Sequence, residues 1–181
     1  MISSIESAAL KALLSHYLET LGAKRLPSRQ DIDALKLGSA LPVIWISEYE
    51  PAAGTFRYRL AGEEVNDAFG QSVNGRLLSE IVSADRFDSV NAAFRRVIEE
   101  EAAMLAVGPV YRCTDRVALG ERLALPLSSD GETADGLIGA TVRKTLVDLD
   151  IAVMQEQKLV YVPVNDLAEP TKREAAGRLR G

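Results

Sequence analysis

Apolar residues recur at helical spacing close to the start of the chain. They form one face made of Leu10, Leu13, Leu14, Tyr17, Leu18 and Leu21. Ser3 and Glu6 fit a capping box ahead of this stripe, and Gly22 follows it as a stop signal. The pattern predicts an amphipathic helix, which a polar link joins to a short helical stretch over residues 33–40.

Two runs with the character of strands come next. Residues 43–46 are β-branched and aromatic, and residues 55–60 alternate large apolar side chains with arginines. Residues 50–54 between them contain proline and glycine, which are typical of a turn. We therefore expect a hairpin with one aromatic face and one basic face.

Helical and then strand patterns fill the middle of the chain. Residues 63–69 and 77–82 predict short helices, and Ser83 can cap a longer one with an apolar side formed by Phe87, Val90, Phe94, Val97 and Ile98. Strands are predicted over residues 110–114, 117–127 and 137–143. In the second of these, Leu119, Leu123, Leu125 and Leu127 share a face, as in a half-buried antiparallel strand.

This order of elements predicts an α+β fold. We expect a five-stranded antiparallel sheet with helices on one face, preceded by the N-terminal amphipathic helix. The expected division is residues 1–40 for the helix and linker, 41–144 for the domain, and 145–181 for a partly flexible C-terminal extension. Within that extension, residues 159–162 read as a short strand and residues 169–181 as a frayed end.

Composition narrows the class of protein. The 181 residues are 47% hydrophobic and 26% charged, as in a globular protein. A net charge of −5 argues against a nucleic-acid partner. No apolar run is long enough to cross a membrane, and the first residues lack the pattern of a signal peptide. The single cysteine, Cys113, excludes an internal disulfide, so we expect a cytoplasmic protein.

Several short motifs of the sequence resemble those of one bacterial family of PAS domains. The resemblance rests on residues 25–29 (RLPSR), 31–33 (DID), 41–42 (LP), 56–62 (FRYRLAG), 69–70 (FG) and 74–76 (NGR), and on residues 125–127 (LPL) and 130–131 (DG) near the end of the domain. Family members carry an N-terminal helix before the fold and a "YRLaG…fG…G+" motif. Glu63 and Ala34 depart from it, since the family usually has Thr and often has Pro there. The resemblance implies a PAS scaffold and a sensory or interaction role, without an agreed ligand.

Residues that could carry catalysis are scarce. His16 is the sole histidine, and its charged and polar neighbours on the helix favour a surface position. Cys113 alternates with Tyr111 on a predicted strand, which favours packing in the sheet over a nucleophile. The run 99–101 of glutamates is a solvated helix face. We expect no catalytic residue, no metal site and no enzymatic activity.

An arginine motif precedes the domain. Arg25 and Arg29 have the R-x-x-x-R spacing of cyclic-dinucleotide sites, but the motif that should follow is absent. An anchoring role is favoured, in which an arginine pairs with Asp31 or Asp33.

The cofactors of other PAS domains have recognisable requirements. A haem version needs an axial ligand on the connecting helix, and residues 83–103 contain no histidine. A covalent flavin version needs a cysteine near residues 74–79, which is also absent. We therefore expect neither, and a noncovalent small ligand stays open. Its pocket would be lined by Trp45, Phe56, Tyr58, Phe69, Phe87 and Phe94, although aromatic residues at these spacings also suit a plain core.

The chain contains no segment recognisable as a kinase, cyclase or DNA-binding element, so any output must pass to a separate protein. The sequence does not identify that signalling partner. The alternative is a dedicated small-molecule-binding protein with no signalling partner. The apolar stripe of the N-terminal helix predicts a homodimer, because a marginal helix is held mainly by burying such a face. Folding back onto its own sheet is the other way to cover it.

Overall fold

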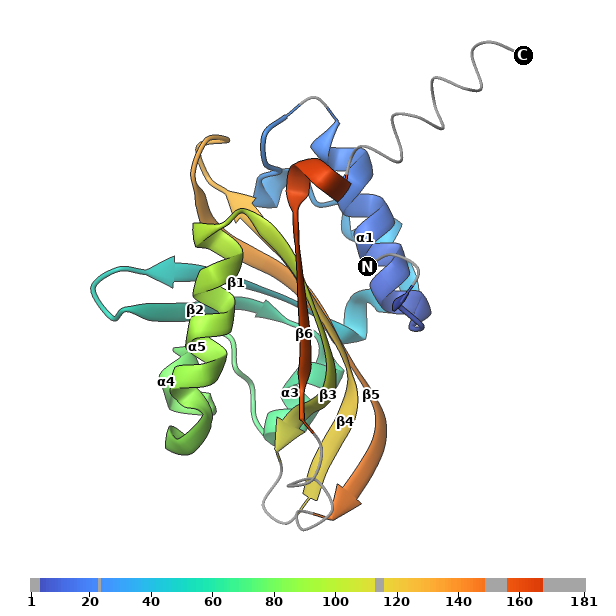
Figure 1. Ribbon diagram of the computed structural model, residues 1–181, viewed down its shortest axis with the longest axis vertical. Helices are drawn as coiled ribbons and strands as arrows, with labels where there is room; N and C mark the ends of the chain where they lie inside the picture. The colour runs from blue at the N-terminus through green and yellow to red at the C-terminus, as the bar shows by residue number, and fades with distance from the viewer. Residues whose placement is uncertain (1–3, 23, 113–115, 149–155, 168–181) are drawn as a thin grey trace.

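The computed structural model describes residues 4–22, 24–112, 116–148 and 156–167. A single antiparallel sheet of six strands runs through these residues in the order β2-β1-β5-β4-β3-β6 (Figure 1). The α+β class is confirmed, while the strand count is six instead of the predicted five. The strands are β1 (Ile44–Glu50), β2 (Thr55–Ala61), β3 (Ala102–Arg112), β4 (Arg116–Ser128), β5 (Ala134–Asp148) and β6 (Lys158–Pro163).

Helices cover both faces of this sheet. In chain order they are α1 (Ala8–Leu21), η2 (Arg29–Asp31), α2 (Ala34–Leu37), η3 (Gly38–Val43), α3 (Glu63–Phe69), α4 (Leu78–Ile81) and α5 (Ala84–Glu99). One apolar core lies between α1 and the sheet, and a second lies between the sheet and α3 to α5. Figure 1 shows α1 and α5 on opposite sides of the strands.

The N-terminal helix is held on its own sheet. Leu10, Leu13 and Tyr17 are fully buried, and the Tyr17 hydroxyl donates a hydrogen bond of 2.8 Å to the carbonyl of Pro126 in β4. Leu14 and Leu21 are also buried there, and Leu18 packs against the same core. The stripe that motivated the homodimer is therefore covered within the chain, and the homodimer itself stays a prediction.

The first turn of α1 is fixed by a buried carboxylate. Glu121 of β4 accepts hydrogen bonds from the backbone N–H groups of Glu6 and Ser7 at 3.1 and 2.9 Å. Lys144 of β5 lies 3.2 Å from the same carboxylate. Burial alone would raise the pKa of Glu121, but the two N–H donors and Lys144 outweigh it, so the pKa is lowered.

Several local predictions on this side of the molecule need correction. The N-cap of α1 is Ser7, whose Oγ accepts the N–H of Leu10 at 3.5 Å, and the predicted capping residue, Ser3, lies outside the described residues. His16 is buried instead of exposed, because its Nε2 accepts the N–H of Asp33 at 2.9 Å. Arg25 pairs with Glu101 at 2.8 Å, and not with Asp31 or Asp33. Cys113 and residues 169–181 lie outside the described residues.

The central strands are longer than the sequence pattern predicts. β3 begins at Ala102, eight residues before the predicted start at Val110. Residues 102–106 are buried on both faces, so they form a continuous apolar run without the alternation that marks a half-buried strand. β6 then pairs with β3 along its outer edge, from Ala102 opposite Pro163 to Val107 opposite Lys158.

Trp45 lies on β1, between β2 and β5, and is only 1% exposed. Its cross-strand partner is Gly139, where an added Cβ would lie 2.2 Å from the indole Cζ2. The indole N–H donates to Thr141 Oγ1 at 3.0 Å, and the ring stacks on Phe94 with centroids 5.1 Å apart. Glycine is therefore required opposite Trp45 by the close approach of the indole.

Candidate functional site

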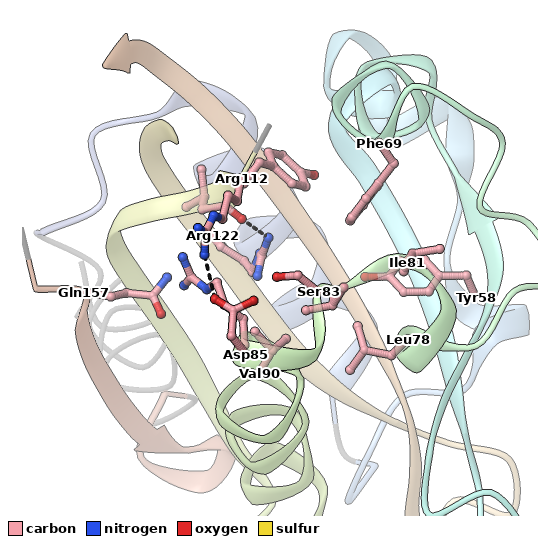
Figure 2. Close-up of a pocket in the computed structure, with 14 residues that line it drawn as sticks. Tyr58, Phe69, Leu78, Ile81, Ser83, Asp85, Val90, Arg112, Arg122 and Gln157 are labelled. Atoms are coloured by element: carbon pink, nitrogen blue, oxygen red, sulfur yellow. Dashed lines mark hydrogen bonds and ion pairs between the residues drawn. The ribbon is translucent and has the colours of Figure 1, made fainter. Parts of the chain in front are cut away.

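A pocket of about 380 Å³ lies between the sheet and the helices α3, α4 and α5. Its size falls within the range of small-molecule sites. Residues from β2, β3 and β4 form the sheet side, and residues from α3 to α5 form the helical side. The mixed lining divides the pocket into an apolar half and a basic half (Figure 2).

The apolar half comes mainly from the short helices. Phe69 ends α3, Leu78 and Ile81 belong to α4, and Val90 belongs to α5. Helix α4 is placed by a capping interaction, in which the Glu80 carboxylate accepts the N–H of Leu77 at 2.6 Å. In Figure 2, Phe69, Leu78 and Ile81 lie on one side of the pocket.

The basic half is built around Arg122 of β4. Its Nη2 donates to the carbonyl of Val110 at 2.6 Å and its Nε donates to Thr141 Oγ1 at 3.0 Å. The guanidinium also lies 5.3 Å from the centroid of the Tyr111 ring and 5.9 Å from that of Phe94. These contacts fix the charged group in place without using a carboxylate.

Two more arginines join Arg122 at this end of the pocket. Arg112 of β3 pairs with Asp85 in the first turn of α5 at 2.6 Å. Arg86 is half-buried beside them. Burial, together with the positive charges of Arg122 and Arg112, lowers the pKa of Arg86, and the negative charge of Asp85 opposes this shift. Among the described residues, no Asp or Glu forms an ion pair with Arg86 or Arg122.

Two buried tyrosines, Tyr58 and Tyr111, also line the pocket. Burial raises the pKa of Tyr58, and the positive charge of Arg122 opposes the rise. Burial likewise raises the pKa of Tyr111, against Arg122 and Thr141. Both hydroxyls are therefore protonated at neutral pH and offer neutral hydrogen-bonding groups, not charge, to the pocket.

The six aromatic residues that the sequence suggested for a pocket fall into two groups in the structure, one that lines the pocket and one that packs in the core. Tyr58 and Phe69 line it. Trp45, Phe56 and Phe94 are buried in the second core, and Phe87 packs against that core. The plain-core interpretation therefore describes most of the set.

Sequence reasoning missed the basic half of the pocket. Arg122 directly precedes Leu123 on a strand whose leucines mark one face, and in a half-buried strand the alternate residues face solvent. Arg86 sits in the first turn of α5, where a charged residue is ordinarily exposed. The available signal was the presence of a small residue, Ala124, two positions after Arg122 on the same face of the strand.

Comparison with known proteins decides the family. A family model described as a PAS domain matches residues 5–142, which is most of the chain. The chain belongs to this PAS domain family. The expected PAS scaffold is thereby confirmed, with the N-terminal helix included in the matched range. PAS domains generally serve as sensory and regulatory modules, and a pocket between the sheet and the short helices is consistent with that class.

Two solved structures show a distant similarity to this chain. The PAS domain from Bordetella pertussis BvgS is 16% identical, with a TM-score of 0.47, over 57% of this chain and 77% of that one. VqmA bound to DPO is 17% identical, with a TM-score of 0.48, over 66% of this chain and 58% of that one. No curated protein matches the sequence. No helix among the described residues is long and apolar enough to span a membrane.

Proposed function

We propose that this chain is a cytoplasmic regulatory module that acts by binding a separate signalling protein. In this proposal a small noncovalent ligand gates the contact between the two proteins. The chain itself has no catalytic activity. The observation that carries the proposal is the 380 Å³ pocket enclosed by α3, α4, α5 and the sheet, in a chain of the PAS family. Neither haem nor a covalent flavin is part of the proposal.

Helix α5 connects the pocket to the surface of the protein. Helix α5 contributes Val90 to the pocket, while Arg95 and Arg96 on its outer side are exposed and pair with Glu99 and Glu100. A ligand that packs against Val90 acts on the same helix that presents these charges to solvent. Helix α5 is then the element that moves between two positions, and its shift changes the surface that a partner contacts.

The experiment compares partner capture by two forms of the full chain in cells of its native host. The first is wild type, and the second is V90W, which fills the pocket from α5. We expect wild type to retain a specific protein that V90W retains in a different amount. A matched control, R95Q, changes the outer side of α5 and leaves the pocket intact, so it separates loss of the pocket from loss of surface charge.

Two results would contradict the proposal. Equal recovery by wild type and V90W would show that the pocket does not gate the contact. Recovery of no specific partner by wild type, with a small molecule still bound, would favour the second function, a dedicated small-molecule-binding protein. The pocket is the specific observation that supports that alternative as well.

A further inference from the structure

One end of the pocket is positively charged, whereas the protein as a whole is negatively charged. The whole chain carries −5, yet three arginines and one carboxylate line the same end of this cavity. Asp85 is already engaged by Arg112 at 2.6 Å. Neither Arg86 nor Arg122 forms an ion pair among the described residues, and the positive charges of Arg122 and Arg112 disfavour the charged form of Arg86, which the charge of Asp85 only partly offsets.

Arg122 is held in position before any ligand arrives. Its Nε and Nη2 are anchored to Thr141 and to the carbonyl of Val110, and the Tyr111 ring lies beneath it. A guanidinium has more N–H donors than these two bonds use, and its flat, forked shape matches the two oxygens of a carboxylate. A group fixed in this way loses little entropy when it binds an anion.

The apolar half of the pocket suits a hydrocarbon group of a ligand. Phe69, Leu78, Ile81 and Val90 present hydrocarbon, and Figure 2 shows the first three across the pocket from Arg112 and Arg122. A free inorganic anion would leave that surface without a partner. A neutral apolar molecule would leave Arg86 and Arg122 without an ion-pair partner.

We propose that the pocket binds a small organic carboxylate with an aromatic or short aliphatic body. The carboxylate lies against Arg122 and Arg86, and the body packs on Phe69, Ile81 and Val90. The proposal rests on the function proposed above, because it names the class of ligand that would gate the module.

Isothermal titration calorimetry on the full chain tests the charge requirement with matched probes. Phenylacetate and phenylacetamide have nearly the same size and shape and differ in charge, and hexanoate replaces the ring with an alkyl chain. We expect phenylacetate or hexanoate to bind, and the amide to bind about tenfold more weakly or worse, since a charged hydrogen bond contributes about 1.5–3 kcal/mol. Affinity for the acid falls as salt rises.

Variants locate the binding and protect the test against misfolding. R86Q and R122Q should each weaken phenylacetate by about tenfold and leave the amide nearly unchanged. R95Q is the matched control for R86Q, because it removes one positive charge from the same helix, α5, outside the pocket. If R122Q fails to fold, R86Q alone carries the test, since the described structure gives Arg86 no ion pair to lose.

Three results would overturn the proposal. They are equal binding of acid and amide, undiminished binding of the acid by R86Q, and no binding of either acid at millimolar concentration. Equal binding of acid and amide would leave the regulatory function standing with a neutral ligand. The regulatory function fails separately, when V90W and wild type capture the same partner in the same amount.

Discussion

Replacing Leu13 with alanine tests whether α1 is docked on its own sheet. Leu13 is fully buried in the core between α1 and the strands. Truncation removes apolar contacts and leaves a cavity, which costs about 2–5 kcal/mol for a buried leucine. Leu35 in α2 provides a matched control, because it is 90% exposed. The change L35A should alter stability by no more than about 0.5 kcal/mol.

Urea denaturation followed by Trp45 fluorescence measures both variants. Trp45 lies in the core on the opposite side of the sheet from α1, so its signal reports unfolding of the whole domain, not local loss of the helix. The expected result is a lower midpoint for L13A with an unchanged slope. Near-equal midpoints for L13A and L35A would refute the docking of α1.

The same pair of variants bears on the predicted homodimer. If α1 instead packs against its twin, the stability lost in L13A depends on protein concentration, and light scattering shows a change from dimer to monomer. A loss of stability that is independent of concentration supports the intrachain packing.

Three further predictions concern the sheet and the start of α1. G139A should destabilise the fold by about 1–3 kcal/mol, because its Cβ would overlap Trp45, and thermal unfolding should show a smaller loss for G136A. Trp45 should emit at the short wavelengths of a buried indole, and an emission maximum at the fully exposed value would contradict its position. The lowered pKa of Glu121 stabilises the fold above the ordinary glutamate pKa of about 4.3, and this contribution is lost as the pH falls through the lower folded value. E121Q should therefore flatten the stability curve below about pH 5, and an unchanged acid limb would count against the assignment.

The parts of the fold that the sequence predicted correctly have simple periodicity. The hairpin alternates Phe56 and Tyr58 with arginines, and the apolar side of α5 recurs at helical spacing. Both elements have one covered face and one solvated face, which is the condition under which periodicity is informative. The start of β3 was missed because residues 102–106 are buried on both faces.

The pocket was less predictable than the fold, for a related reason. Aromatic residues were candidates for its lining with a plain core as the alternative, and Trp45 and Phe94 stack on each other in the core. The basic half depends on Arg86, Arg112 and Arg122, which come from three elements. Their convergence follows from the pairing of β3 with β4 and from the crossing of α5 over the sheet, which are long-range relations that no local pattern records.

Native mass spectrometry tests the central claim, that the pocket between α5 and the sheet is a ligand site. The measurement is made on wild type and on V90W, each freshly purified from the native host. We expect a small-molecule mass on wild type that is lost from folded V90W. A wild-type protein that carries no added mass, or a V90W protein that carries the same mass as wild type, would contradict it.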